Sequence, residues 1–217
     1  MQSRLVAMIA VAVVLSLSAQ TQTKPVRQAT PKQAASPGDD SQLYRNTAFG
    51  FRFQIPYGWV DRSQQMQEGS ESGKSELLLA VFERPPGAIG DTVNSAAVFA
   101  VESAAAYPGL KKAEDYLGPL TELATGKGFK PDGEPYLLDV ESRQLLRADF
   151  VKTLEGKATE AKDNGEKLTM RQCTLVLLTK GQIVSFTFIA GSEDELDDLM
   201  DGLHFSETKL PAHKNLP

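Results

Sequence analysis

LTMRQCTLVLLT (residues 168–179), KG (180–181) and QIVSFTFIA (182–190) form the stretch of sequence that decides the fold. The two longer runs are rich in β-branched and apolar residues, which favour strands. They are separated by two residues that end in glycine, a spacing typical of antiparallel strands joined by a tight turn. The stretch therefore predicts a buried β-hairpin.

A capped amphipathic helix is predicted directly after this hairpin. Ser192 is a candidate N-cap, and Glu195, three residues later, can complete a capping box. The apolar residues that follow recur at i, i+3, i+4 and i+7, which places them on one face of a helix: Leu196, Leu199, Met200 and Leu203. We therefore expect this helix to lie back on the sheet.

The rest of the chain predicts an α+β fold in which helices pack on an antiparallel β-sheet. The polar segment 61–75 is predicted to be a mobile loop, and residues 153–167 an exposed hairpin tip. Runs 76–83 and 173–190 are apolar on both sides, so helices or loops are expected to cover both faces of the sheet. Further strands are predicted at 43–46, 51–55, 76–83, 96–102, 135–140, 144–152 and 203–205, and a helix within 108–126, where Pro119 would kink the helix or begin its second half as an N1 proline.

The N-terminal end has the pattern of a cleaved signal peptide over residues 1–19. Arg4 precedes an uncharged apolar run at 5–17, and small residues follow it. This run is shorter than the roughly 20 residues that a membrane-spanning helix needs. We therefore expect an exported protein, periplasmic or secreted, that does not span the membrane after cleavage.

Two further segments flank the predicted folded domain, which extends over residues 43–206. Residues 20–42 are rich in Pro, Thr and Gln and contain almost no large apolar side chain, which predicts a disordered linker. Residues 207–217 are predicted to be a flexible tail.

The formal net charge of −5 gives no electrostatic footprint for nucleic acid. The acidity is concentrated on the predicted terminal helix, which carries six carboxylates: Glu193, Asp194, Glu195, Asp197, Asp198 and Asp201. Cys173 is the only cysteine, so no intramolecular disulfide can form, and we expect it to be a small buried hydrophobe.

Two surfaces are candidate partner-binding sites. Tyr57 and Trp59 belong to the densest aromatic cluster, which either forms core and sheet edge or lines a groove for recognition. Asp197, Asp198 and Asp201 either form a solvated helix face or dock a basic partner. A weak site for a hard cation such as calcium is a further hypothesis for these carboxylates, although their spacing is not that of an EF-hand loop.

No catalytic residue, metal ligand or cofactor is predicted. The sequence contains no Gly-x-Ser-x-Gly elbow, no Walker loop and no Gly-x-Gly-x-x-Gly after a strand. His204 and His213 lack a second ligand at zinc spacing. A Ser/His/Asp triad assembles in space rather than in sequence, so a hydrolase with an unrecognised site stays an open hypothesis.

One pattern resembles the PsbP-like superfamily. It consists of Tyr44-x-Asn46-x-x-x-Gly50-Phe51-x-Phe53-x-x-Pro56-x-Gly58-Trp59, the helix near Tyr116-Leu117, and the stretch from Gly181 to Phe186 that leads to the capped helix. The resemblance extends over about 43–206. It implies an α/β/α sandwich that binds proteins and has no common catalytic site. The chain lacks the lipid-anchor cysteine that some bacterial members carry near position 20.

The sequence thus predicts an exported, non-catalytic binding module, rather than an enzyme, that contacts another protein of unknown identity or an envelope component. The alternative is a carrier of a small ligand or metal ion that uses the surface near Trp59.

Overall fold

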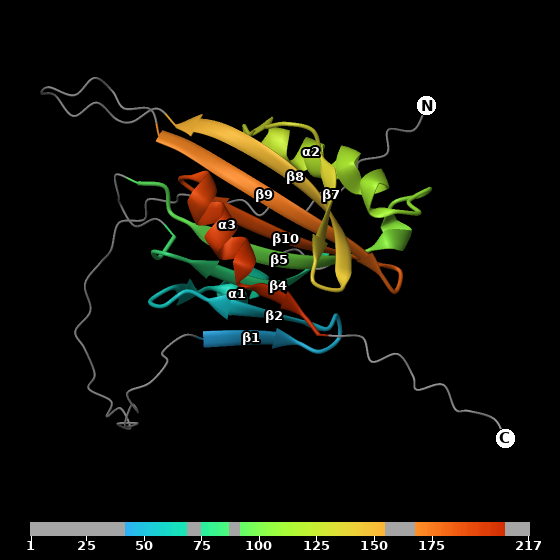
Figure 1. Ribbon diagram of the computed structural model, residues 1–217, viewed down its shortest axis with the longest axis horizontal. Coiled ribbons are helices and arrows are strands. Elements are labelled where there is room, and N and C mark those ends of the chain that lie inside the picture. Colours follow the sequence, from blue (N-terminus) through green and yellow to red (C-terminus); the bar gives the residue numbers. More distant parts are fainter. Residues whose placement is uncertain (1–41, 69–74, 87–91, 155–167, 207–217) are drawn as a thin grey trace, which may run out of the picture.

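The computed structural model describes residues 42–68, 75–86, 92–154 and 168–206 (Figure 1). The predicted signal peptide, the linker up to residue 41 and the tail 207–217 lie outside the described residues. So does the predicted hairpin tip from residue 155 onward. The last residue assigned to the linker, Gln42, is the first residue of strand β1.

An eight-stranded antiparallel sheet forms the centre of the molecule, in the order β3-β4-β5-β10-β9-β8-β6, with β7 also paired to β8. Its strands are β3 (Val60–Asp61), β4 (Ser75–Phe82), β5 (Ala96–Ser103), β6 (Lys130–Pro131), β7 (Tyr136–Val140), β8 (Arg143–Leu154), β9 (Leu168–Thr179) and β10 (Gln182–Ala190). The predicted central hairpin is confirmed as β9–β10. Lys180 and Gly181 both have positive φ, 51° and 72°, which is the geometry of the two-residue turn expected there.

A separate three-stranded sheet, in the order β1-β2-β11, lies against one face of the main sheet. It contains β1 (Gln42–Asn46), β2 (Phe51–Ile55) and β11 (Leu203–Phe205). The sequence predicted all of these strands but not that they form a second sheet. The pairing of β11 with β2 joins residues about 150 positions apart, and local patterns carry no information about such a choice.

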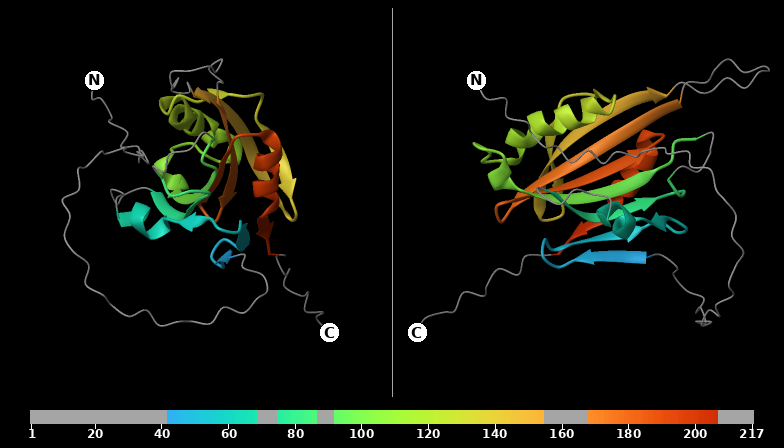
Figure 2. Two further views of the ribbon diagram at one scale, coloured as in Figure 1. Left: turned by 90° about the vertical axis from the view of Figure 1, so that its left-hand side faces the viewer. Right: turned by 180° about the vertical axis from the view of Figure 1, so that it is seen from behind.

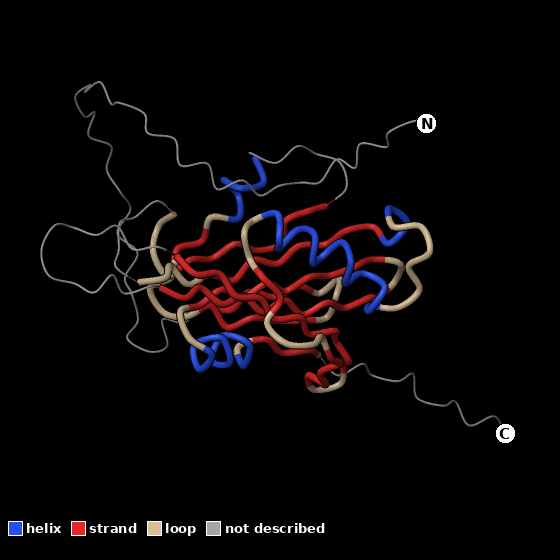
Figure 3. The backbone as a smooth tube through the Cα atoms, turned by 90° about the horizontal axis from the view of Figure 1, so that it is seen from above, coloured by secondary structure: helices blue, strands red, loops and turns tan. Residues whose placement is uncertain are grey.

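Helices cover both faces of the main sheet, so the α+β prediction is confirmed (Figures 2 and 3). α3 (Glu193–Asp201) lies on the same face as the small sheet. α1 (Ser63–Glu68) and α2 (Leu117–Gly126), with the short 3₁₀ turns η1 (Ala104–Ala106) and η2 (Ala113–Tyr116), lie on the other face.

α1 corrects the prediction of a mobile loop over 61–75 for residues 63–68; residues 69–74 lie outside the described residues. The Ser63 hydroxyl accepts a hydrogen bond from the Ala80 amide at 2.8 Å, and the Arg62 amide donates to the Ala80 carbonyl at 2.8 Å. Met66 packs against buried residues of β4. Because Met66 is the only apolar residue of the helix, no periodicity could reveal it; its role is to cover the edge of β4.

α2 begins two residues earlier than the proline pattern suggested. Pro119 is the third residue of α2, not the first, and the segment before it is a 3₁₀ turn. A proline is tolerated there because the amides of the first helical turn have no acceptor within the helix. Leu120 and Ala124 are buried against β8 and β9.

The main core lies between the large sheet, the small sheet and α3. Six phenylalanine rings form its centre: Phe51, Phe53, Phe99, Phe186, Phe188 and Phe205. The apolar stripe predicted for the terminal helix points into this core, because Leu196 and Leu199 are 3% and 5% exposed.

Candidate functional site

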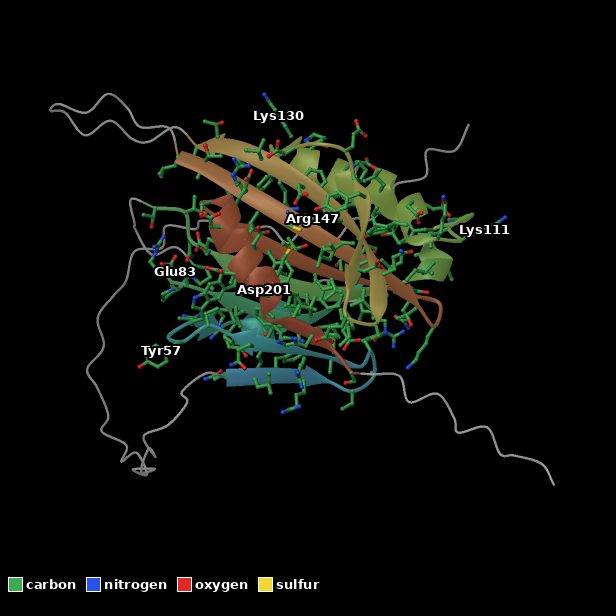
Figure 4. The ribbon with its side chains drawn as sticks, in the orientation of Figure 1. Tyr57, Glu83, Lys111, Lys130, Arg147 and Asp201 are labelled. Carbon is green, nitrogen blue, oxygen red and sulfur yellow. The ribbon has the colours of Figure 1, made fainter. Side chains whose placement is uncertain are left out.

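The two aromatic candidates differ in exposure. Tyr57 lies in the turn between β2 and β3, where Gly58 has a φ of 80°, and its side chain is 78% exposed. Trp59 is half-buried and packs against the main core. Figure 4 shows Tyr57 pointing outward at one end of the sheets. Of the two, Tyr57 is the residue that is largely exposed.

The six carboxylates of α3 separate into two groups, and the first is engaged within the protein. Glu193 lies 3.1 Å from Arg171, and Asp197 lies 3.8 Å from Arg147. Glu195 turns back toward β5 and accepts hydrogen bonds from the Ser95 hydroxyl at 2.5 Å and from the Gly191 amide at 3.1 Å. These three acids therefore serve the fold at least in part.

The second group consists of Asp194, Asp198 and Asp201, which we call the acidic stripe. They are exposed and follow one another at i, i+4 and i+7, so they lie on one outward face of α3. No hydrogen bond or ion pair from these side chains to any other residue occurs within the described part of the chain. The sequence named Asp197, Asp198 and Asp201 as candidate partner-binding residues; in the structure Asp197 lies 3.8 Å from Arg147, whereas Asp194 makes no such contact within the described residues.

The basic residues beside α3 were not anticipated. Arg147 on β8 also binds Asp149 at 2.9 Å, and Arg171 on β9 also binds Asp132 at 2.9 Å. Figure 4 shows Arg147 on the sheet above the N-terminal half of α3 and Asp201 at the other end of the helix. Arg147 and Asp149 are two residues apart on β8, whereas the pairs Arg147–Asp197, Arg171–Asp132 and Arg171–Glu193 join distant parts of the chain that no sequence spacing could have indicated.

Cys173 is fully buried between β9 and α3, with its Sγ atom 3.4 Å from the Met200 sulfur. Burial raises the pKa of the thiol, and the negative charge of Asp149 raises it further. The thiol is therefore held protonated, as expected for a small buried hydrophobe rather than a reactive group.

A second polar cluster lies beneath η1 and η2, on the other face of the sheet. Both oxygens of the Glu102 carboxylate accept hydrogen bonds, one from the Tyr107 hydroxyl and one from the Tyr116 hydroxyl at 3.0 Å. Burial, together with Glu102, raises the pKa of Tyr107 to about 12. The cluster fastens the segment 104–116 to the end of β5.

Glu141 joins the β7–β8 turn to the small sheet. Its Oε2 atom accepts a hydrogen bond from the Phe205 amide at 2.7 Å, and its Oε1 atom lies 2.9 Å from His204 Nδ1. These hydrogen bonds, and then the positive charges of His204 and Arg52, lower the pKa of Glu141 from its ordinary value of 4.5.

We expect Glu141→Gln to lower the free energy of unfolding near neutral pH but not in acid. Because the folded-state pKa is depressed, the carboxylate stabilises the protein above pH 4.5, and this contribution disappears as the pH falls through the folded-state value. The side chain is 42% exposed, so solvent limits the effect to less than about 1 kcal/mol. Urea unfolding of both proteins at about pH 7 and pH 3 measures it; an equal difference at the two pH values would contradict the assignment.

The described residues contain neither a cluster of metal-binding side chains nor a long apolar helix. No three His, Cys, Asp or Glu side chains of these residues converge in a way that could hold a metal ion. No helix of the described ranges has the length and apolar character needed to cross a bilayer. The hypotheses of a ligand carrier and of a hydrolase stay untested.

Comparison with known proteins identifies similar folds. No protein-family model matches the chain. A search of curated proteins also finds no match. Among solved structures, cyanobacterial PsbP (CyanoP) from Synechocystis sp. PCC 6803 matches with 12% identity and a TM-score of 0.49, over 81% of this chain and 98% of that one.

Two further structures match in the same way. LpqN, involved in cell envelope biogenesis of Mycobacterium tuberculosis, has 14% identity and a TM-score of 0.36 over 78% of this chain and 87% of that one. The Saccharomyces cerevisiae Ran-binding protein Mog1p has 11% identity and a TM-score of 0.41 over 76% of this chain and 95% of that one. These three structures are what the described part of the chain resembles; at identities of 11–14% and TM-scores below 0.5, nothing about function follows from the resemblance.

Proposed function

We propose that the chain is an exported, non-catalytic binding module that contacts a basic segment of a protein partner through the acidic stripe. Asp198 and Asp201 were already candidates from the sequence, and Asp194 joins them. Asp197 contributes from the flank, beside Arg147, and Tyr57 supplies a separate exposed ring at one end of the sheets. Trp59 supports the turn that carries Tyr57.

The observation that carries this proposal is a row of exposed carboxylates, Asp194, Asp198 and Asp201, that make no hydrogen bond or ion pair within the described residues. Like charges at i and i+4 on a helix destabilise it by about 0.2–0.5 kcal/mol per pair. Asp201 lies in the last turn, where the helix dipole disfavours a negative charge by about 0.3–1 kcal/mol. An arrangement that costs stability is expected where a bound partner supplies the missing positive charge.

The length of the acidic stripe favours a polypeptide over a single ion. Asp194 and Asp201 are seven residues apart, which corresponds to about 10 Å along a helix. A calcium ion needs six to eight oxygens at about 2.3–2.6 Å, so one ion does not join both ends of this row. Lysine or arginine side chains spaced along a partner segment fit it instead.

The test is a triple variant, Asp194→Asn, Asp198→Asn and Asp201→Asn, of the mature full chain carrying an affinity tag. Capture from envelope extracts of the producing cells is compared at about 50 mM and 300 mM salt, because contacts between exposed charges weaken with screening. We expect the wild-type chain to retain a basic protein at low salt and the triple variant to lose it. The variant should be about as stable as the wild type, since less repulsion within α3 offsets the loss of the Asp194 charge, which the helix dipole favours in the first turn.

A matched control is the triple variant Glu76→Gln, Glu122→Gln and Glu134→Gln, which removes an equal number of negative charges from exposed positions outside α3. It should capture the partner as the wild type does. Equal capture by all three proteins would show that the acidic stripe is only a solvated helix face. Equal loss of capture in both variants would show that binding depends on the total charge of the protein and not on these three positions.

A further inference from the structure

Within the described ranges, two five-residue strands have an outer edge that pairs with no strand: β1 in the small sheet and β7 beside β8. On the main sheet, β3 and α1 cover the edge of β4, and β6 and β7 cover the outer edge of β8. β1 pairs on one side with β2 and, within the described ranges, with no strand on the other. Figure 1 shows it as the outermost element on its side of the molecule. An open edge of this kind presents backbone donors and acceptors to an added strand.

Two arginines and a histidine lie in a row across the outward face of the small sheet, and the row ends at this edge. Arg45 on β1 lies directly opposite Arg52 on β2, and Arg52 lies directly opposite His204 on β11. Arg45 and Arg52 are exposed, whereas Phe51 and Phe53 of β2 point into the core. Like charges at directly opposite positions of antiparallel strands destabilise the pairing.

A carboxylate ends this row on the β11 side. Glu141 accepts the backbone amide of Phe205 and lies within hydrogen-bond distance of His204. The Glu141 carboxylate therefore pairs both with a backbone amide of β11 and with the His204 side chain of the row. Its negative charge also interacts with Arg52. At the β1 end, no carboxylate of the described residues contacts Arg45.

We propose that the edge of β1 receives an extended, acidic peptide of a partner protein, which pairs as a fourth strand of the small sheet. A glutamate or aspartate of the peptide, placed opposite Arg45, would pair with the side chain at the β1 end of the row, as Glu141 pairs with His204 at the β11 end. Leu43 is 38% exposed on the same face as Arg45, two residues earlier. Because side chains alternate along a strand, the peptide should carry an apolar residue two positions from its acidic residue.

The charges of the chain itself argue for a partner rather than for self-pairing. Residues 1–38, the segment before β1 that is long enough to fold back on it, contain no aspartate or glutamate. β1 itself, QLYRN, contains none either, so a second copy paired edge to edge offers no carboxylate to Arg45. The edge of β1 is a different surface from the acidic stripe, so a negative result at one surface does not contradict binding at the other.

The test uses a synthetic peptide of about nine residues, capped at both ends, in which threonine alternates with valine or glutamate. A second peptide has glutamine in place of glutamate. Amide chemical shifts and hydrogen exchange of residues 42–46 are followed by NMR during titration of the mature full chain. We expect the glutamate peptide to protect amides of β1 and to bind about fivefold more tightly than the glutamine peptide, the ratio that corresponds to about 1 kcal/mol for one exposed charge pair.

Arg45→Gln should bind both peptides equally, because the charge that distinguishes them is gone. Lys130→Gln removes one positive charge at the opposite side of the molecule and should keep the wild-type preference (Figure 4). The proposal is overturned if residues 42–46 do not respond, if the wild type does not distinguish the peptides, or if Arg45→Gln still does. Protection of these amides in a dimer without peptide would assign the edge to a second copy and would also overturn it.

Discussion

Replacing Phe99 by alanine is expected to lower the free energy of unfolding by about 4–5 kcal/mol, the largest loss from any single truncation considered for this chain. Phe99 is fully buried on β5, and four phenylalanine rings surround it edge-on at centroid distances of 5.0–5.9 Å: Phe51, Phe53, Phe186 and Phe188. The first two belong to the small sheet and the last two to β10. Truncation therefore removes the ring that joins the two sheets.

Urea unfolding measured by tryptophan fluorescence and by circular dichroism checks this value. Phe150→Ala is a suitable control, because Phe150 is equally buried in the core beneath α2 but makes no ring–ring contact within the described residues. It should cost about 1–2 kcal/mol less, since each edge-on ring pair adds about 0.5–1.5 kcal/mol to simple burial. If Phe99→Ala leaves too little folded protein, Phe99→Leu, with about 1–2 kcal/mol lost, gives the same ranking. Equal losses in the free energy of unfolding for Phe99→Ala and Phe150→Ala would contradict the idea that the ring of Phe99 packs the two sheets together.

The second large effect is expected from Glu195→Ala, at about 2–3 kcal/mol. The Ser95 hydroxyl, on a residue that is only 1% exposed, donates to the Glu195 carboxylate, and the Gly191 amide donates to its other oxygen. Without the carboxylate these donors lose their acceptor, and a buried donor left unpaired costs about 1–3 kcal/mol. Glu193→Ala, at an exposed position of the same turn, should cost less than about 1 kcal/mol.

A double-mutant cycle with Ser95→Ala separates this contact from helix propensity. In the Ser95→Ala background, Glu195→Ala should lower the free energy of unfolding by at least about 1 kcal/mol less than in the wild type. The reason is that the Ser95 hydroxyl, which would lose its acceptor, is already absent. Additive losses would mean that Glu195 acts only through the start of α3. Thermal and urea unfolding of the four proteins provide the comparison.

Glu195 also illustrates how far local sequence patterns reach. The sequence placed it correctly at the third position of a capped helix, and the Ser192 side chain does accept from the Glu195 amide at 3.2 Å. The Glu195 carboxylate, however, binds Gly191 and a serine 100 residues away instead of the Ser192 amide. Capping depends on neighbours in sequence and is predictable, whereas the choice of a distant hydroxyl depends on how β5 passes the helix.

The same distinction holds for the fold and for the candidate site. The β9–β10 hairpin and α3 were predictable because turn residues, alternation and the apolar stripe all agree within a few positions. α1 and the separation of the small sheet were not, since they depend on contacts with β4 and on the pairing of β11 with β2. The turn at Gly58 determines that Tyr57 is exposed and that Trp59 packs on the core. The positions of Arg147 and Arg171 determine which carboxylates of α3 form ion pairs.

The buried thiol of Cys173 has a practical consequence for experiments on this protein. It is the only sulfhydryl of the chain and is shielded by α3, so a maleimide or iodoacetamide reagent reaches it when the helix detaches or the core opens. Its alkylation rate thus reports the frequency of that opening without any engineered label. In the native state, a cysteine introduced at the surface can be modified selectively, and dyes or photoreactive groups can be attached at either proposed contact face while the natural cysteine is left in place.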